Sequence, residues 1–590
     1  MKNIYFIACI LLVGLTSCNE DYLEKLPKDQ LTEQTTFTTN ANFETFAWGF
    51  YSSSFGGYND WTNINREFSA DLMSQSNGSQ GNDWLWQRAI VPSTSGNWSG
   101  PYARIRRVNL MLSNIETSLL TDIEKEHWTS VGYFFRALEY HKLINLYGDV
   151  PYIDTVLTED DSESLFGPRT PRNEVAQHIL EDLQWAEMHI NEDGNGPNTI
   201  NTDVVRALIS RFGLFEGTWR KYHNLGGEEV YLRASLIASA ALVSDNPGLM
   251  PKYDEVFNSS SLKGKPGILL FKEYIFGELG HALTSRHRNS AGYWDLTKRA
   301  VDSYLCIDGE TRWTSDLFDG DHDAYDEFRN RDRRLYYTTV PPFKVDTNGK
   351  NQLTWEHDAD PKHREFIDLM ATLSDDSHKA LPTLNWRGLV VKTEPHFRKS
   401  NNGQGFNVSY TGYRSHKYYN ALAFIQNKDF SNAPIFRMGE VMVNYAEAAF
   451  ELGEFSQAIA DLTVNKLRVR GEVASLDIAA ITEDPSRDVS VDAVLWEIRR
   501  ERAVELMFEG YRFDDLRRWK KWNEYAGTEK LGRYVVNADY GNKLPIQGGA
   551  SEGYVSPWGV PPGIPEHYYL WPIPSEQIVL NPQLEQNPGW

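Results

Sequence analysis

Apolar side chains recur at helical spacing in two separate parts of the chain. In the first part they step by three and four residues, the spacing that places them on one face of an α-helix. The first stripe comprises Ile105, Val108, Leu112, Ile115 and Leu119. Thr121 and Glu124 then have the spacing of a capping box, and the stripe that follows stops at Gly148, with Pro151 beyond it. These signals predict two consecutive helices with a defined end.

The same periodicity predicts four helix pairs along the chain. They cover about 102–147, 171–221, 437–470 and 491–522. Gly453-Glu454-Phe455 followed by Ala458 is typical of the turn in a tetratricopeptide unit, and such units bury a core by stacking on their neighbours. We therefore predict a mainly α fold with four tetratricopeptide-like helix pairs, plus an irregular loop-rich subdomain with few short strands.

The loop-rich parts lie between and after these pairs. Periodicity is poor over about 222–434, apart from a helix near Tyr231 to Val243, and the tail 541–590 is irregular and rich in Pro and Gly. The long insert carries many aromatic residues, whereas disordered segments are poor in them. We expect ordered loops carried by the helices, so that 40–590 forms a single body.

The first residues have the pattern of an export signal. The apolar run from Ile4 to Leu15 is too short to span a membrane, which needs about 20 residues, and it fits a signal peptide over 1–17. Leu15-Thr16-Ser17-Cys18 is similar to a bacterial lipoprotein signal. That resemblance implies cleavage before Cys18, acylation of Cys18 and a polar tether over 18–39. The alternative is an ordinary secreted protein with a chance cysteine.

Composition narrows the class of partner. Asp and Glu outnumber Lys and Arg by 81 to 59, which gives a formal net charge of −22. A nucleic acid needs a basic face, so we expect no nucleic-acid partner. Of the three cysteines, Cys9 would be removed and Cys18 acylated, which leaves Cys306 without an intramolecular partner.

The sequence gives little support for catalysis. It contains neither an H-E-x-x-H zinc motif nor a phosphate-binding loop. A glycosidase would need two carboxylates across a cleft, and the many acidic residues leave that possibility open. The helical scaffold favours a binding protein that is not an enzyme and uses no cofactor.

An ordered series of motifs runs nearly from end to end. They are Asp21–Glu24, Tyr102–Asn109, Phe135–Ala137, Leu146–Pro151, Asn330–Arg334, Thr411–Tyr413, Arg437–Ala448, Ile498–Trp519 and Trp571–Trp590. In this order they make the chain resemble the SusD/RagB family of outer-membrane lipoproteins. The most specific of them is Ile498–Trp519, which reads IRRERAVELMFEGYRFDDLRRW.

The resemblance implies a location and a task. Family members are lipid-anchored at the cell surface in the outer membrane, bind oligo- or polysaccharide, and work with a SusC-like TonB-dependent transporter. Some relatives handle peptides, so a peptide-binding member is one alternative. A tetratricopeptide scaffold that binds only proteins is another.

Glutamates recur every four residues in the most specific motif. They are Glu497, Glu501, Glu505 and Glu509. Like charges at this spacing destabilise an isolated helix, so we predict an ion-pair network that pins the last helix pair to the core. The expected cations, on the same helix or its neighbour, are Arg499, Arg500, Arg502, Arg512, Arg517 and Arg518.

Aromatic residues in loops are the candidate ligand contacts, because rings stack on the C–H faces of sugars while polar side chains bond the hydroxyls. The first candidate is a loop that contains Asn82, Asp83, Trp84, Trp86 and Arg88. Further candidates are Tyr58, Trp61, Tyr293, Trp294 and Trp313. The alternative is that these rings pack in the core, or that the alternation buries one ring of the Trp84–Trp86 pair.

One acidic turn suggests a metal ion weakly. Asp319, Asp321 and Asp323 stand at alternate positions, as in a calcium loop. Ala324 and Asn330 replace the Gly and Glu that such a loop requires. A solvated acidic turn is therefore favoured, and no metal is expected.

Overall fold

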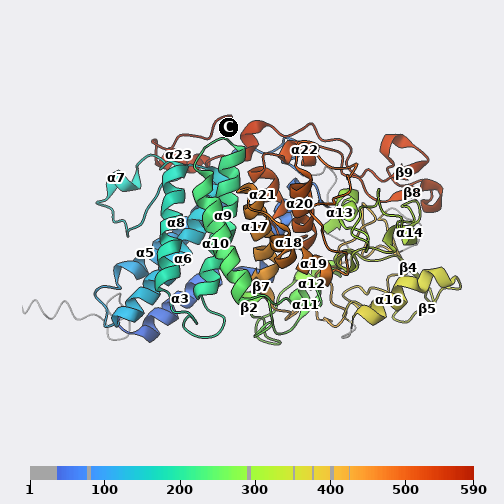
Figure 1. Ribbon diagram of the computed structural model, residues 1–590, viewed down its shortest axis with the longest axis horizontal. Helices are drawn as coiled ribbons and strands as arrows, with labels where there is room; N and C mark the ends of the chain where they lie inside the picture. Colours follow the sequence, from blue (N-terminus) through green and yellow to red (C-terminus); the bar gives the residue numbers. More distant parts are fainter. Residues whose placement is uncertain are drawn as a thin grey trace, which may run out of the picture.

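Long helices standing side by side form the left and central part of the protein in Figure 1. Each packs against the next in the order α5, α6, α8, α9, α10, α17, α20. Their bounds are α5 Gly96–Ser113, α6 Asp122–Tyr147, α8 Arg172–His189, α9 Thr202–Tyr222, α10 Glu228–Asp245, α17 Met438–Glu451 and α20 Ala493–Glu505. Val108, Phe135, Leu183 and Leu208 from the apolar stripes are buried together in one core.

The computed structural model describes residues 36–75, 82–288, 294–349, 352–374, 378–398, 404–423 and 425–590. The expected signal peptide, Cys18 and most of the expected tether lie outside the described residues, as does Tyr293. Within the described ranges, no helix is both long and apolar enough to cross a membrane.

The capping signals before α6 act as the sequence predicts. The Thr121 hydroxyl accepts from the backbone N–H of Glu124 at 3.3 Å, and the Glu124 carboxylate accepts from the N–H of Thr121 at 2.8 Å. Gly148 follows the helix with φ of 73°, a left-handed value that favours glycine. The helix therefore ends where the chain can turn toward Pro151.

Helix α10 belongs to the helical layer, although it falls within the range predicted as the loop-rich insert. It packs along α9 on one side and α17 on the other, so it joins the two parts of the stack. Gly213 and Gly217 on α9 permit this close approach, because a Cβ at Gly213 would lie 2.6 Å from the carbonyl oxygen of Tyr231. The loop-rich part thus begins after Asp245 rather than at 222.

The two late helix pairs are more broken than their apolar stripes suggest. The partner of α17 is split into α18 (Gln457–Leu462) and α19 (Val464–Arg470), with Thr463 non-helical between them. The partner of α20 is split into α21 (Arg512–Arg518) and α22 (Trp522–Ala526), with Lys520 at φ of 53°.

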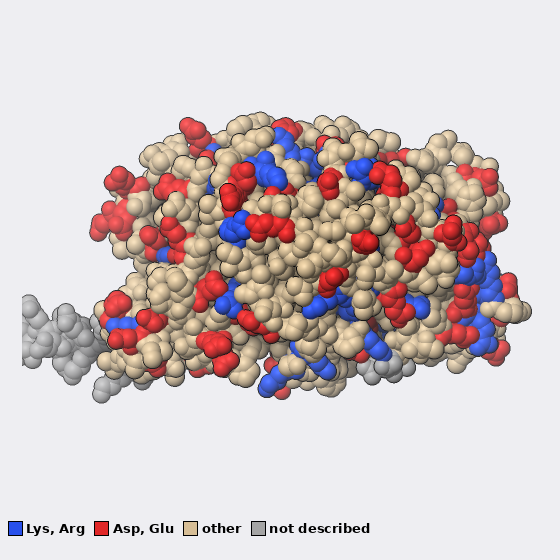
Figure 2. Space-filling model, in the orientation of Figure 1, with Lys and Arg blue, Asp and Glu red and all other residues tan. Residues whose placement is uncertain are grey.

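Short antiparallel strand pairs stabilise the loop-rich subdomain, much of which lies to the right in Figure 1. The pairs are β1 Met73–Gln75 with β3 Trp294–Leu296, β2 Ile268–Lys272 with β7 Ala433–Arg437, β4 Phe343–Asp346 with β5 Glu356–His357 and β6 Thr393–Glu394, and β8 Tyr534–Val536 with β9 Glu552–Tyr554. The remaining helices are α3 Asn40–Ser54, α4 Thr62–Arg66, α7 Ser162–Leu165, α11 Glu255–Asn258, α12 Leu283–His287, α13 Lys298–Ser303, α14 Ala324–Phe328, α15 Arg333–Thr338, α16 Glu365–Leu373 and α23 Ser575–Leu580. On the face shown in Figure 2, basic side chains are interspersed with acidic ones.

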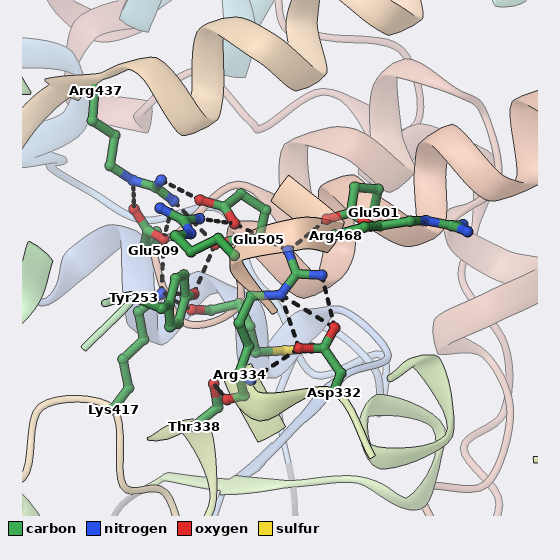
Figure 3. Close-up of polar contacts among 12 residues, drawn as sticks. Tyr253, Asp332, Arg334, Thr338, Lys417, Arg437, Arg468, Glu501, Glu505 and Glu509 are labelled. Carbon is green, nitrogen blue, oxygen red and sulfur yellow. Dashed lines mark hydrogen bonds and ion pairs between the residues drawn. The ribbon is translucent and has the colours of Figure 1, made fainter. Parts of the chain in front are cut away.

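A buried ion-pair network joins the helical layer to this subdomain (Figure 3). Glu505 is fully buried and contacts Arg334, Arg437 and Arg470. The neighbouring carboxylates continue the network: Glu501 contacts Arg334, and Glu509 lies 2.6 Å from Arg437 and 2.7 Å from Lys417. The predicted network is therefore present.

The predicted partners of these glutamates were mostly wrong. Only the Arg500–Glu497 contact, at 3.2 Å, joins one of the glutamates to an arginine from the predicted set. The other cations come from α15, from α19, from the end of β7 and from the loop that holds Lys417. The glutamates carry like charges and cannot neutralise one another, so most of their cations come from elements that pack across the helix.

Gly213→Ala tests the close packing of α9 on α10. The added methyl would collide with the backbone of α10, so we expect a loss of about 1–3 kcal/mol in unfolding free energy. Gly96→Ala is the matched control, because nothing lies within 4 Å of its Cβ position. Urea unfolding of both variants checks this, and equal stability of the two would contradict the packing.

Glu505→Gln tests the network. Loss of the charge leaves buried arginines without a counter-ion, so we expect unfolding free energy at pH 7 to fall by about 3–5 kcal/mol. Asp368→Asn, in the exposed pair with Arg364, should change stability little.

The stability difference between wild type and Glu505→Gln should depend on pH, because protonation of Glu505 is coupled to folding. Burial alone would raise the pKa of Glu505, but Arg470, Arg437 and Arg334 outweigh it and hold that pKa below its ordinary range. The ordinary value in an unfolded chain is about 4.3. A depressed folded pKa contributes stability above that value and loses it as pH falls. The stability gap between wild type and Glu505→Gln should therefore narrow from pH 7 to pH 3.5, and a constant gap would count against the network.

Candidate functional site

A hollow of about 560 Å³ opens where α13, α20, α21 and α22 meet the loop 528–531. We call it the Trp313 hollow. Its aromatic walls are Trp313, Trp496, Trp519 and Tyr525. Its polar walls include Arg299, Asp488, Lys521, Glu524, Thr528 and Lys530.

Three rings border the hollow, and an arginine side chain lies near each of them. Trp313 is 43% exposed. Trp496 and Tyr525 are half-buried, with ring centroids 6.5 Å apart. The indole N–H of Trp496 donates to Asp484 at 2.9 Å, and the hydroxyl of Tyr525 donates to Asp488 at 2.9 Å. These bonds hold each ring by its polar edge, which fixes its orientation.

Donors and acceptors lie beside these rings. The ammonium group of Lys521 is 2.9 Å from Asp488. The side chain of Arg299 is 44% exposed, donates to the carbonyl oxygen of Tyr525 at 3.3 Å, and lies 3.6 Å from Asp71. The arrangement can stack on apolar ring faces and bond hydroxyl groups at the same time.

Lys530 forms part of the wall between this hollow and a smaller one. Its ammonium group donates to the carbonyl oxygens of Phe68 and Met73 at 2.7 and 2.6 Å. Burial lowers the pKa of Lys530 to about 7, and Asp71 only partly opposes that shift. The smaller hollow, about 20 Å³, also contains Trp86 and Trp558 and shares Thr528 and Lys530 with the larger one.

The predicted Trp84–Trp86 pair does not form one platform. The ring of Trp84 stacks on Trp571 at 5.0 Å and meets Tyr568 edge-on at 5.2 Å, so it packs against the C-terminal tail. Trp86 alone borders a hollow. This corresponds to the alternative in which one ring of the pair is used for packing.

The polar residues of that loop shape the loop itself. The Asn82 side-chain oxygen accepts from the backbone N–H of Trp84 at 3.0 Å, which closes a turn. Asp83 and Arg88 pair with each other at 3.0 Å on the surface. Of the predicted loop residues, Asn82 and Trp86 reach the small hollow.

The other predicted aromatics divide between core and surface. Trp294 is buried, with its indole N–H donating to Asn65 at 3.0 Å. Trp61 meets the Trp294 ring edge-on at 5.9 Å and donates to the carbonyl oxygen of Tyr58. Tyr58 is buried, and its hydroxyl donates to the carbonyl oxygen of Phe257 at 2.9 Å. Of the predicted residues, Trp313 alone borders the Trp313 hollow.

The acidic turn does not gather its carboxylates. Asp321 faces inward, 2.8 Å from Arg312, while Asp323 caps α14 by accepting from the N–H of Tyr325 at 2.8 Å. Asp319 lies 4.0 Å from Arg329. Among the residues that the structure describes, no group of three or more His, Cys, Asp or Glu side chains is placed to hold a metal ion. The geometry therefore gives the calcium alternative no support.

One chance motif match has the wrong context for catalysis. Gly549-Ala550-Ser551-Glu552-Gly553 has the G-x-S-x-G spacing of a hydrolase elbow. That elbow places its serine between a strand and a following helix. Ser551 is exposed and leads into strand β9 instead.

Trp496, Tyr525 and Thr528 were missed by reasoning from the sequence. Trp496 belongs to the helix pair predicted over about 491–522, whereas Tyr525 and Thr528 lie beyond its predicted end and were assigned to no element. Their place beside Trp313 depends on the way α20 and α22 meet the loop after α13. Aromatic content alone carries no signal for that meeting.

Comparison with known proteins identifies the class. Residues 272–590 match the family model described as the SusD family, and residues 21–214 match one described as starch-binding associating with outer membrane. Because the first match alone covers more than half of the chain, the protein belongs to the SusD family.

Individual relatives agree with this assignment. SusD-like protein P2 from Formosa agariphila is 26% identical over 572 residues, which cover 93% of this chain and 97% of the relative. SusD-like protein P38 from the same organism is 23% identical over 599 residues, covering 99% and 98%.

Solved structures share the fold. A SusD-like protein from Bacteroides fragilis matches with a TM-score of 0.68 and 19% identity, covering 96% of this chain and 100% of that chain. A SusD-like carbohydrate binding protein from the same organism gives 0.67 and 20%, covering 93% and 100%. The predicted mainly α, tetratricopeptide-like fold is confirmed.

Lys530→Met tests the wall of the Trp313 hollow. Lysine in an unfolded chain has a pKa of about 10.4. Between that value and the lowered folded value, the unfolded chain binds a proton that the folded chain lacks, so stability rises with pH. Wild type should therefore gain stability relative to Lys530→Met from pH 7 to pH 9 in chemical denaturation. Lys520→Met, which removes a surface ammonium, should show no such change. If the stability difference between wild type and Lys530→Met does not change with pH, the ammonium group of Lys530 lies in water.

Proposed function

We propose that this protein is a cell-surface glycan-binding lipoprotein that captures an oligo- or polysaccharide in the Trp313 hollow. The observation that carries the proposal is the grouping of Trp313, Trp496 and Tyr525 beside Arg299 and Glu524. Sugar rings present apolar C–H faces to aromatic rings and hydroxyl groups to charged side chains. A hollow of about 560 Å³ lies within the range of small-ligand pockets, about 300–1,000 Å³.

The site suits capture because its rings stand on firm supports. Trp496 lies on α20, the helix that the buried ion-pair network holds in place. Tyr525 lies on α22 and is fastened by its hydrogen bond to Asp488. Ring faces that are already oriented lose little entropy when a ligand stacks on them.

Family membership supports the wider role. We propose acylation at Cys18, anchoring in the outer membrane with the body at the cell surface, and delivery of the glycan to a SusC-like TonB-dependent transporter. The description of one matching family model as starch-binding and associating with the outer membrane is consistent with this. The protein would bind and hand over its ligand without cleaving it.

Trp313→Ala tests the proposal. A panel of polysaccharides that includes starch would first be screened by affinity gel electrophoresis, and oligosaccharides of the retained polymer would then be titrated calorimetrically. Loss of a stacking ring should weaken binding about tenfold or more, equivalent to about 1.4 kcal/mol. Trp48→Ala is the matched control, because Trp48 is similarly exposed, at 47%, but lies on α3 in the helical layer.

The outcomes separate the alternatives. Unchanged affinity in Trp313→Ala would exclude the Trp313 hollow as the glycan site. Absence of binding to every polysaccharide, with retention of a peptide, would favour the peptide-binding alternative. Retention of neither would favour a scaffold that binds only proteins.

A further inference from the structure

A second and larger hollow, about 700 Å³, lies between the segment 53–66 and the helices α5, α6 and α9. We call it the central chamber. It shares no lining residue with the Trp313 hollow. One charged wall of the chamber is formed by Asp60, by Arg66 on α4, by Arg104 on α5 and by Lys142 on α6.

Cations on this wall outnumber the carboxylates available to them. Arg104 and Lys142 share one buried carboxylate, Glu139, at 2.8 and 2.7 Å. Arg66 donates to the side-chain oxygens of Asn97 at 2.8 Å and Asn63 at 3.2 Å. Among the described residues, no carboxylate forms an ion pair with Arg66, and its Nε has no hydrogen-bond partner.

Lys272 adds a fourth positive charge behind the wall. Its ammonium group donates to the carbonyl oxygens of Phe55 and Gly56 at 2.9 and 3.3 Å, and Asp60 is the carboxylate whose charge it feels. Four cations therefore face Glu139 and Asp60, while Asp514, which also acts on Arg66, is paired with Arg517. The local excess is two positive charges, in a chain whose formal net charge is −22.

The other charged groups that line the chamber are already neutralised. The pairs are Arg211 with Glu440, Arg437 with Glu509, Arg502 with Asp515, Arg518 with Glu447, and Arg517 with Asp514. His141 also lines the chamber, and burial lowers its pKa to about 3, so it is neutral at pH 7. The excess charge thus resides at Arg66, Arg104, Lys142 and Lys272.

The surroundings of these cations disfavour their charge. Burial lowers the pKa of Arg66, of Lys142 and of Lys272, and the nearby carboxylates do not restore it. A cation held in this way gains when an anion enters its surroundings, because the anion supplies the missing counter-charge.

We propose that the central chamber is an anion-binding site that takes a small oxyanion or the carboxylate or sulfate group of a charged sugar. The guanidinium of Arg66 and the ammonium of Lys142 are the groups that contact the anion. The chamber shares no lining residue with the Trp313 hollow, so variants of the two sites can be tested separately.

Isothermal titration calorimetry of the protein tests whether the central chamber binds anions. Sodium sulfate and sodium galacturonate would be titrated separately at constant ionic strength into wild type, Arg66→Gln and Lys142→Gln. Saturable binding to wild type at one site is expected for at least one probe, and each variant should weaken it about tenfold or more, since a charge-assisted hydrogen bond is lost. Arg88→Gln, which removes a surface cation paired with Asp83, should bind as wild type does.

The outcomes are decisive in both directions. Tighter binding of sulfate would assign the chamber to free oxyanions, and tighter binding of galacturonate would assign it to charged sugars. Absence of saturable binding to either probe, or equal affinity in wild type and both chamber variants, would overturn the proposal. If circular dichroism shows that Arg66→Gln does not fold, Lys142→Gln decides alone, since its side chain is 35% exposed and its removal leaves Arg104 with Glu139.

Discussion

Glu501 and Glu505 stand one helical turn apart on α20 and are buried, and Glu509, just after the helix, joins the same network half-buried. Removing several carboxylates from water at this spacing is unfavourable unless each gains cations that water no longer screens. The cations come from α15, α19, the end of β7 and the loop at Lys417, all outside α20. Helix α20 can therefore occupy its place only when these separate elements are in theirs. The helical layer and the loop-rich subdomain are linked by that requirement.

The same helix borders the Trp313 hollow, which we propose as the glycan site. Trp496 and Arg500 lie on α20 and border the Trp313 hollow, while the neighbouring Glu497 and Glu501 enter the network. The ion pairs that neutralise the buried glutamates thus also fix the helix that carries the Trp496 ring. Loops that carry ligand-binding side chains gain precision when the scaffold beneath them cannot move.

The two hollows differ in their electrostatics. In the Trp313 hollow, Lys521 has Asp488, Arg299 and Arg512 share Asp71, and aromatic rings stand beside these pairs. In the central chamber, Arg104 and Lys142 share one carboxylate and Arg66 has amide partners. Aromatic rings beside paired charges suit a hydroxyl-rich ligand, whereas cations that lack a carboxylate of their own suit an anion. One chain can therefore offer sites for two kinds of chemistry.

Local signals in the sequence determined the early helices well. The Thr121–Glu124 capping box and the stripe through Val131 and Phe135 act within one or two helical turns, so their effect does not depend on the rest of the fold. The spacing of the glutamates also revealed a buried network, because like charges four residues apart need partners wherever those partners come from. The helix over Glu228–Asp245 was visible too, but its place in the stack was not.

Only the tertiary structure decided which cations and which rings are used. Arg334 reaches Glu501, and Trp571 covers Trp84, through contacts between segments far apart in the chain. Trp313 stays exposed because α20 and α22 leave space beside it, and Trp294 is buried because β3 pairs with β1. Burial of a loop side chain depends on what packs against it, and spacing along the sequence carries no information about that partner. The sequence therefore specified the helices and the class of protein, while packing chose the residues that can meet a ligand.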